Sequence, residues 1–500
     1  MRMANETALA VDLSEDRWWM QHPTLSAVWC AMEWTSRASL ALLVLGLCLF
    51  LPAAACRGLP RGGLRTQEKT GMSKNMNLAL ATTMLLDYSC TDQYQPSMPQ
   101  MAEVFQVSPS AMGYTIQVHL LSCAAGTLMV GPLSDRMGRR PVILACQSML
   151  AVSTFACMCA SDLLWFMAGR VLQGLAASVY VVILASLRDC YADPGARLRA
   201  MGTLMSLMLV GPIFAPSMGG LLASYAGWRC PFLVLALLSL SLTLFSVFVL
   251  EETAVAPKTS EGYLRDIYRV VRDRRRVMIL LCVGTTKSLF DVVISSNGFI
   301  LEDTYGQSVR GAARIAAAFA ISCALGSLLA RRLHRRPTEV LLLFIPILLG
   351  AAGLLVLGAC FSESLGWYVS VICILQLLVF PPIIAYHAEF TEELQDIAGV
   401  ATSVALCAQY LLSSLISLPG VVLAESGVRG MLFFLAGVVV VTELITWFLR
   451  PAVSVKEEDE EDEEETEEET KEETKEETEE EEEDEEGDDG RGRGGGDGGG

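Results

Sequence analysis

Long apolar runs alternate with short polar connections along most of this chain. Twelve runs approach or exceed the roughly 20 apolar residues that a helix needs to cross a bilayer. We place them at residues 76–97, 111–133, 140–160, 162–184, 199–224, 229–250, 276–299, 313–331, 338–360, 365–386, 396–423 and 428–449. Because a lipid-embedded segment must satisfy its own backbone hydrogen bonds, the pattern predicts an all-α membrane protein with twelve transmembrane helices.

Arginines concentrate in every second connection between these runs, except the connection after the tenth run, which has acidic residues and no cation. The connections after the second and fourth runs, for example, contain Arg136, Arg139, Arg140, Arg188, Arg197 and Arg199. The intervening connections contain few cations beyond Arg229, Arg310, Arg314 and Arg429. Since cytoplasmic loops carry the excess of Lys and Arg, both ends of the twelve-helix region are expected in the cytoplasm.

The longest connection inside this region, 251–275, divides the runs six and six. An internal repeat supports the division: the segment that starts at Gly326 keeps the glycine, leucine and cations of the segment that starts at Gly131. The repeat predicts two six-helix bundles, 76–250 and 276–450, joined by a cytoplasmic linker at 251–275. A binding site between the two bundles, near the middle of the bilayer, is expected for such a repeat.

The connection after the second run reads Gly-Pro-Leu-Ser-Asp-Arg-Met-Gly-Arg-Arg-Pro over residues 131–141. Gly131 permits a close helix approach, Asp135 can meet a helix N-terminus, and Gly138 permits a tight turn. Arginines hold this turn on the cytoplasmic face, and they are Arg136, Arg139 and Arg140. The string resembles the loop 2–3 signature of the major facilitator superfamily, whose fold is the twelve-helix arrangement expected above. The alternative is an ordinary cytoplasmic turn, which also favours Gly, Arg and Asp.

Further motifs resemble the bicyclomycin-resistance (Bcr/CflA) group of drug:proton antiporters within that superfamily. They are Asp92-Gln-Tyr-Gln-Pro-Ser-Met-Pro99, Arg170-Val-Leu-Gln-Gly174, Gly211-Pro-Ile-Phe-Ala-Pro-Ser-Met-Gly-Gly220 and Phe299-Ile-Leu-Glu-Asp-Thr-Tyr-Gly-Gln-Ser308. The third motif resembles the antiporter element. Its prolines and glycines break regular helix and predict a hinge for alternating access at Gly211, Pro212, Pro216, Gly219 and Gly220. Close packing against a neighbouring helix is the alternative explanation, and the two are compatible.

Two carboxylates lie within the first run, where a charged group is costly and needs a partner, a cavity or a function. Asp87 is near the middle of the run and Asp92 is nearer its outer end. A site poor in water disfavours the charged carboxylate, so either group is a candidate for proton exchange. The resemblance implies that Arg170 is their counter-charge, and a structural ion pair is the alternative.

Other polar residues within the runs are candidates for a substrate cavity, namely Gln117, Gln173, Lys287, Asp291 and Gln409. Lys287 and Asp291 are one helical turn apart, and a mutually neutralising pair is the simpler explanation for them. The fifteen cysteines are read as small apolar side chains and not as metal ligands or disulfides.

The two ends of the chain differ from the region between them. The N-terminal extension, 1–75, contains an apolar segment at 38–56 that ends in small residues, a layout typical of a signal or targeting peptide. A thirteenth span or an over-extended gene model are the alternatives. The tail, 451–500, contains 27 acidic and five basic side chains, so it is expected to be a disordered, solvated spacer.

The function expected from these features is proton-coupled antiport of small organic molecules. The alternatives are a proton-independent carrier or symporter for a metabolite, and a non-transporting membrane receptor or scaffold. We expect no enzymatic activity, cofactor, bound metal or nucleic-acid partner, because no phosphate-binding glycine loop or metal-ligand spacing occurs. The expected partners are the lipid bilayer, a small-molecule substrate and protons, with the protein a monomer in the plasma membrane or an organelle membrane such as that of a plastid.

Overall fold

The computed structural model describes residues 72–449, apart from 192–195, 197–198, 202–203, 205–209, 255–261, 334–336, 361–363, 393 and 395–396. The apolar segment 38–56, nearly all of the 1–75 extension and the acidic tail 451–500 lie outside the described residues.

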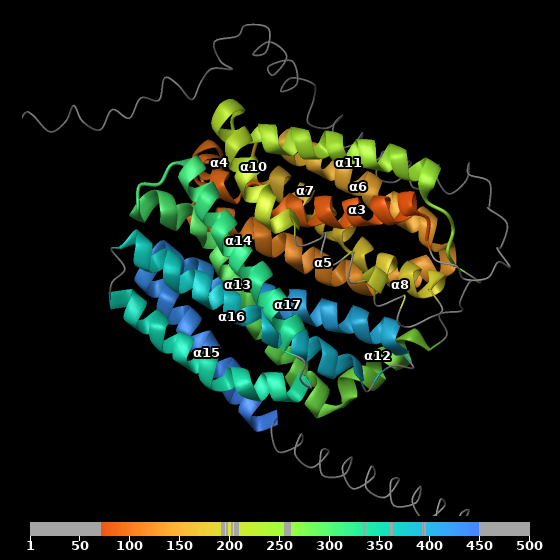
Figure 1. Cartoon of the computed structure of the whole chain (residues 1–500). Coiled ribbons are helices and arrows are strands. Elements are labelled where there is room, and N and C mark those ends of the chain that lie inside the picture. The colour runs from red at the N-terminus through yellow and green to blue at the C-terminus, as the bar shows by residue number, and fades with distance from the viewer. Residues whose placement is uncertain are drawn as a thin grey trace, which may run out of the picture. The chain divides into compact units, whose positions relative to one another are not determined.

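Helices form the framework of the described chain (Figure 1). Ten of the described helices are long and apolar enough to cross a membrane. They are α5 (Pro109–Met137), α6 (Arg139–Met158), Leu163–Cys190 made of α7 (Leu163–Ala177) and α8 (Val179–Cys190), α11 (Arg229–Val249), α13 (Arg274–Phe299) with its π-helical end (Ile300–Thr304), α14 (Val309–Arg332), α15 (Pro337–Cys360), α16 (Leu365–Glu392), α17 (Ala398–Glu425) and Val428–Leu449. Helices α3 (Lys74–Asp92) and α10 (Val210–Ala226) lie at the first and fifth expected spans, so the fold agrees with twelve.

The first expected span, 76–97, is not one continuous helix, and that prediction is corrected here. Helix α3 ends at Asp92, a 3₁₀ turn follows at Gln95–Ser97, and α4 then covers Met98–Phe105. Proline lacks the backbone N–H that donates in a helix interior, so Pro96 and Pro99 favour the first turns of new segments, and they lie there in this structure. The break places Asp92 at a helix end, and Gln95 immediately follows it.

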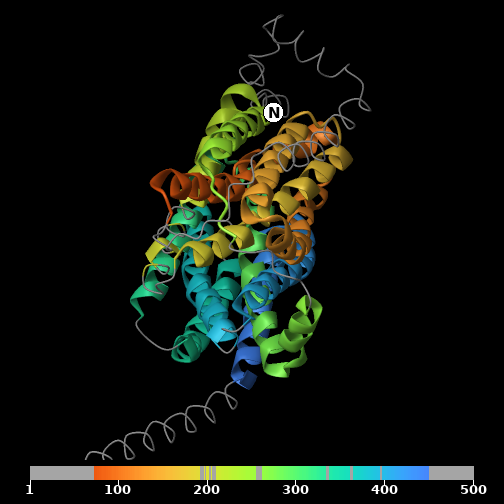
Figure 2. The ribbon, with the colours of Figure 1, turned by 90° about the vertical axis from the view of Figure 1, so that its right-hand side faces the viewer.

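The helices group by their position in the sequence (Figures 1 and 2). Contacts join α5 to α7 and α6 to α11 in the first group, and α13 to α17 and α14 to α16 in the second. Between the groups, α5 contacts α17 and α10 contacts α14. The division at 251–275 stays a prediction, and within that segment the structure describes one further helix, α12 (Tyr263–Arg272).

Glycines allow equivalent helix pairs to touch in the two groups. A Cβ added at Gly174 of α7 would lie 2.2 Å from the His119 carbonyl oxygen of α5. A Cβ added at Gly326 of α14 would lie 2.2 Å from the Leu377 carbonyl oxygen of α16. Only the absence of a side chain permits such contacts, which are typical of helices that pack within a membrane.

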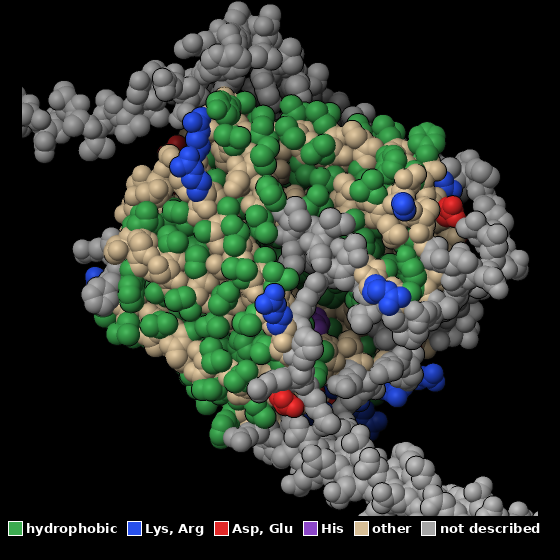
Figure 3. All heavy atoms as spheres, viewed as in Figure 1, with side chains coloured by type: hydrophobic (Ala, Val, Ile, Leu, Met, Phe, Trp, Pro, Cys, Tyr) green, Lys and Arg blue, Asp and Glu red, His purple; other side chains and the backbone are tan. Residues whose placement is uncertain are grey.

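Apolar side chains cover much of the outward surface of the helices (Figure 3). Leu164, Phe248 and Phe433 are among the exposed large hydrophobic residues. An apolar surface of this extent would drive aggregation in water and is expected where lipid surrounds a protein. The helices therefore fit a multi-pass membrane protein.

Candidate functional site

Arg170 is completely buried within the first group of helices. Its guanidinium donates to the Cys90 carbonyl oxygen at 3.1 Å and to Gln173 Oε1 at 2.7 Å, and it lies 5.0 Å from the centroid of the Tyr94 ring. Among the described residues no ion pair joins Arg170 to Asp87 or Asp92. The expected counter-charge is thus held by oxygen dipoles and an aromatic face instead of a carboxylate.

Gln173 was expected in the substrate cavity, but it lies inside the first group of helices. The side chain is completely buried, and its Nε2 donates to Thr154 Oγ1 at 2.8 Å while its Oε1 accepts from Arg170. Both ends of the amide are therefore occupied within the bundle. Gln173 orients Arg170 and is not a cavity contact in this structure.

Asp87 and Asp92 are both buried on α3 but differ in their surroundings. The Oδ1 atom of Asp87 has no hydrogen-bond partner among the described residues. Asp92 Oδ1 accepts from Gln95 Nε2 at 2.8 Å, a bond that the helix break after Asp92 makes possible. Asp92 is therefore the carboxylate whose orientation a side-chain hydrogen bond fixes.

Asp92 borders a narrow space that both groups of helices line. Pro212 and Pro216 of α10 line it from the first group, and Phe290 and Asn297 of α13 line it from the second. Asp92 thus lies where a change in the relative position of the two groups would alter its surroundings.

Lys287 and Asp291 form an ion pair along one turn of α13, as their spacing predicted. The ammonium group also lies 4.7 Å from the centroid of the Phe290 ring. Asp291 is almost fully buried, and its Oδ2 has no hydrogen-bond partner among the described residues. The pair neutralises itself while leaving one carboxylate oxygen available.

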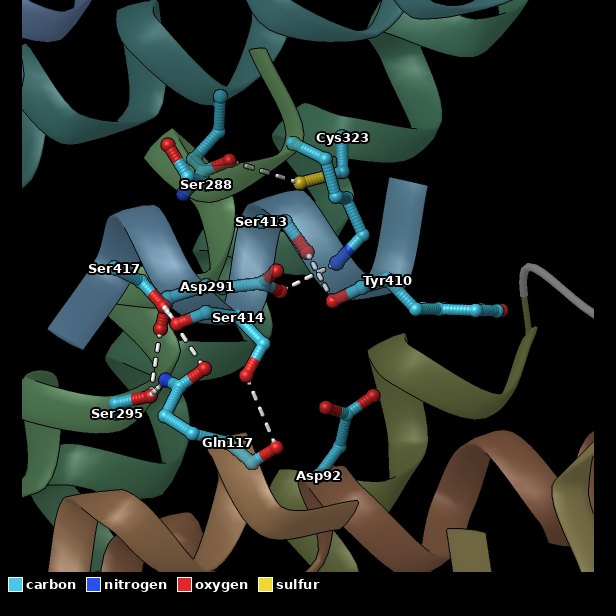
Figure 4. Close-up of polar contacts among 12 residues, drawn as sticks. Asp92, Gln117, Ser288, Asp291, Ser295, Cys323, Tyr410, Ser413, Ser414 and Ser417 are labelled. Carbon is cyan, nitrogen blue, oxygen red and sulfur yellow. Dashed lines mark hydrogen bonds and ion pairs between the residues drawn. The ribbon is translucent and has the colours of Figure 1, made fainter. Parts of the chain in front are cut away.

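A polar cluster, here called the Gln117 cluster, joins α5 of the first group to α13 and α17 of the second (Figure 4). Gln117 Nε2 donates to Ser295 Oγ at 2.8 Å, and Gln117 Oε1 accepts from Ser417 Oγ at 2.8 Å. Ser414 Oγ donates to the Gln117 carbonyl oxygen at 3.1 Å. The glutamine was predicted as a cavity contact, whereas the serines were not identified, although Ser414 and Ser417 are one turn apart in the sequence.

In Figure 4 the Asp92 side chain extends from the ribbon of the first group of helices, whereas Asp291 lies among the ribbons of the second group. No hydrogen bond joins Asp92 to the Gln117 cluster in the described structure. Gln409, the last predicted cavity residue, is buried on α17 and contacts His387 Nε2 of α16 at 2.7 Å. It therefore belongs to a separate polar contact within the second group.

The residues of the 131–141 turn contact one another and Glu252, which follows the C-terminal end of α11. Asp135 forms an ion pair with Arg139 at 2.6 Å, and Arg139 Nε also bonds Asp189 at 3.0 Å. The helix N-terminus that Asp135 was expected to meet is instead bound by Glu252, which accepts from the backbone N–H groups of Arg139 and Arg140. A helix N-terminus favours a carboxylate, and Glu252 reaches it from the end of α11.

Two glycines in the same turn differ in what they require. Gly138 has a φ of +97°, a conformation that side chains strongly disfavour, and an added Cβ would lie 2.4 Å from Glu252 Oε2. At Gly131 an added Cβ would lie 3.6 Å from Ser403 Oγ, which is ordinary contact. The close helix approach expected at Gly131 is therefore not found there. The remaining arginines differ too, since Arg140 donates to the Val247 carbonyl oxygen while Arg136 is exposed.

The proposed hinge glycines of α10 lie against other helices. An added Cβ would lie 1.8 Å from the Gln93 carbonyl oxygen at Gly219 and 2.5 Å from Ala313 Cβ of α14 at Gly220. At Gly211 it would lie 3.2 Å from the Leu85 carbonyl oxygen. Close packing thus accounts for all three glycines, and the hinge remains a prediction.

Comparison with known proteins places the chain in a family. The model of the Major Facilitator Superfamily matches residues 78–418. The chain is 31% identical over 225 residues to the uncharacterized MFS-type transporter YdgK of Bacillus subtilis (strain 168), covering 43% of this chain and 56% of that protein. It is 33% identical over 172 residues to the multidrug resistance protein MdtL of Escherichia coli O45:K1, covering 34% of this chain and 44% of that protein. The chain thus spans about half the length of these curated relatives.

Solved structures agree with this assignment at the level of the fold. A D-xylose-proton symporter matches with a TM-score of 0.62 and 14% identity, covering 75% of this chain and 97% of the symporter. The human organic anion transporter MFSD10 (TETRAN) matches with a TM-score of 0.54 and 17% identity, covering 75% and 99%. With the match of the family model over most of the helices, these findings show that the chain is a multi-pass membrane protein that belongs to the major facilitator superfamily.

Proposed function

We propose that this protein is a secondary transporter that exchanges small organic molecules for protons by alternating access. The observation that carries the proposal is the position of Asp92, a buried carboxylate beside a space lined from both groups of helices. Ionisable groups at such a depth in a membrane are costly, and they mark ion and substrate pathways in transporters. In a repeat transporter, the interface between the repeats is where substrate and coupling ion bind.

The surroundings of Asp92 suit a carboxylate that alternates between protonated and charged forms. Burial disfavours a charged carboxylate, while the hydrogen bond from Gln95 stabilises it. A movement that changes the distance between α3 and α13 would shift this balance. Proton uptake on one side of the membrane and release on the other then follow from the same movement that carries the substrate.

The lining of this space favours an amphipathic, positively charged substrate. Phe290 and Phe319 contribute aromatic rings to the lining, Pro212 and Pro216 add apolar surface, and Asp92 supplies the negative charge. Aromatic faces and a carboxylate together bind organic cations. The similarity to a protein named for multidrug resistance and the motifs that resemble the Bcr/CflA group support the same class of substrate.

The membrane in which the protein works is part of the proposal. The two named curated relatives are bacterial proteins, which favours the plasma membrane over a plastid. We further propose that the monomer transports, because a single chain supplies both groups of helices that line the space beside Asp92.

The test uses the purified full chain in proteoliposomes with a trapped pH-sensitive dye and ethidium as the organic cation. Ethidium added to the wild type is expected to move protons across the membrane, and a proton gradient is expected to drive ethidium flux. Asp92→Asn should reduce this coupled flux at least tenfold, about 1.4 kcal/mol in activation free energy, and Asp87→Asn with Asp92→Asn should abolish it. Glu103→Gln, which neutralises an exposed carboxylate on α4, is the matched control and should transport like the wild type.

The outcomes separate the three functions. Undiminished proton-driven flux in the double variant, with normal membrane insertion, would rule out the proposed coupling. Ethidium flux without proton movement would identify a proton-independent carrier. Absence of flux for a panel of organic cations, anions and sugars would favour a receptor or scaffold.

A further inference from the structure

Helix α12 (Tyr263–Arg272) carries three distinct stripes of side chains at helical spacing. The inner stripe is Tyr263, Ile267 and Val270, and Val270 is completely buried. The second stripe is apolar but exposed, with exposed fractions of 80% for Leu264, 61% for Tyr268 and 41% for Val271. The third stripe is basic and also exposed, and it contains Arg265, Arg269 and Arg272.

The inner stripe fixes α12 to the transmembrane helices. The Tyr263 hydroxyl donates to the Leu128 carbonyl oxygen of α5 at 3.0 Å, and α12 also packs against α17 and α13. Burial raises the pKa of Tyr263 to about 12, so the hydroxyl keeps the proton that it donates. The transmembrane helices thus cover the inner stripe of α12. They leave the apolar stripe exposed, so something other than these helices must cover it.

The position of α12 in the sequence places it at one end of the membrane region. It directly precedes α13, which begins with Arg274, Arg275 and Arg276. Figures 1 and 2 show it beside the ends of longer helices and not between them. The excess of arginine assigns this end to the cytoplasmic side of the membrane.

A helix with an apolar stripe and an adjacent basic stripe at such a position has a known physical preference. Apolar side chains enter the boundary between headgroups and acyl chains, and the arginines remain at the level of the phosphates. The inner leaflet carries anionic lipids, which attract basic segments near its surface. Helix α12 contains three arginines and one acidic residue, Asp266, so the net charge of the helix is positive.

We propose that α12 lies in the cytoplasmic membrane interface and binds the headgroups of anionic phospholipids. Leu264, Tyr268 and Val271 enter the lipid, and Arg265, Arg269 and Arg272 bind the phosphates. The occupant is a lipid surface, because the basic stripe is complementary to anionic headgroups and the exposed apolar stripe is complementary to acyl chains.

The first measurement is the thermal stability of the full chain in detergent micelles, titrated with phosphatidylglycerol or with zwitterionic phosphatidylcholine. Phosphatidylglycerol is expected to raise Tm more than phosphatidylcholine, and salt should weaken the difference. In Arg265→Gln/Arg269→Gln/Arg272→Gln, the concentration of phosphatidylglycerol that gives half of the shift should rise roughly a hundredfold, since each arginine contributes about 1 kcal/mol. Arg310→Gln/Arg314→Gln/Arg429→Gln removes the same charge at the outer side, and it should respond like the wild type.

A second measurement locates the lipid and guards against a variant that is merely misfolded. Backbone hydrogen exchange of the wild-type chain in nanodiscs should be slower over residues 263–272 with phosphatidylglycerol than with phosphatidylcholine. Leu264→Ser/Tyr268→Ser should lose that protection. Equal exchange in the two lipids, or an unchanged half-shift concentration in the α12 arginine variant, would overturn the proposal.

Discussion

Lys287 and Asp291 show how one charged residue determines the cost of another inside the membrane. Each is the other's ion partner on α13, and Asp291 is almost fully buried. Removing one partner leaves an uncompensated charge, which costs about 3–5 kcal/mol in buried pairs. Asp291→Asn is therefore expected to lower the stability of the purified protein strongly, as measured by its Tm in one detergent.

The matching double variant makes the interpretation specific. Lys287→Met/Asp291→Leu removes both charges and should recover most of the stability lost in Asp291→Asn, because neither member of the pair is left as a charge without its partner. If the double variant is less stable than Asp291→Asn, the two losses add, and the pair does not act as a neutral unit.

At the residue scale, the sequence predicts contacts that are local and misses those that are not. The spacing of Lys287 and Asp291 predicts their pair because helix geometry alone brings them together. The partners of Arg170 were mispredicted, since it binds the Cys90 carbonyl oxygen and every residue has such an oxygen. Glu252 was missed at the N-terminus of α6 because it lies more than a hundred residues away in sequence.

At the scale of elements, hydropathy predicts the spans because lipid imposes one length and one composition on every transmembrane helix. Pro96 and Pro99 favour the break after Asp92 and are visible in the sequence. The continuous apolar pattern nevertheless predicted a single helix over 76–97. The π-helical end of α13 at Ile300–Thr304 has no such marker. Its geometry depends on contacts that the chain forms only when folded.

Gly174 provides the prediction at this scale. Gly174→Ala would place a methyl group 2.2 Å from the His119 carbonyl oxygen, so α5 and α7 must separate. We expect a loss of about 1–3 kcal/mol, which is typical of overpacking, measured as a lower Tm or a lower denaturant midpoint. Gly350→Ala on α15 is the control, because an added Cβ there has no atom within 4 Å.

The control should be neutral or slightly stabilising, since alanine favours helix by about 1 kcal/mol over glycine. A Gly174→Ala protein as stable as the Gly350→Ala protein would show that α5 and α7 can part without loss. The close contact would then have no structural role.

At the scale of the whole chain, the internal repeat predicts two bundles, but it does not say which faces meet. Gln117 was a candidate cavity residue because it is polar within a span. Its partners Ser295 and Ser417 could be found only once α5, α13 and α17 were seen together. The faces that meet between the bundles become visible only in the folded chain, because they join residues that are far apart in the sequence.

The Gln117 cluster leads to a prediction about that arrangement. The cluster joins α5 to α13 and α17, and Glu425 of α17 accepts from the Ser110 backbone N–H, near the outer end of α5. Alternating access requires these outer contacts to break when the site opens outward. Gln117→Leu should therefore favour the outward-open state. The loss of polar contacts worth about 1 kcal/mol in a membrane would increase the ratio of outward-open to closed protein about fivefold.

Spin labels on the outer ends of α5 and α17 can measure this ratio from their distance distribution. Gln147→Leu is the matched control, because Gln147 makes a comparable bond to Thr83 wholly within the first group of helices. It should lower stability without changing the distance distribution. Since both variants replace a buried glutamine by leucine, a shift in Gln117→Leu alone would assign the effect to the interface between the bundles. Equal shifts in both, or none in either, would mean that the Gln117 cluster stabilises the fold without controlling its opening.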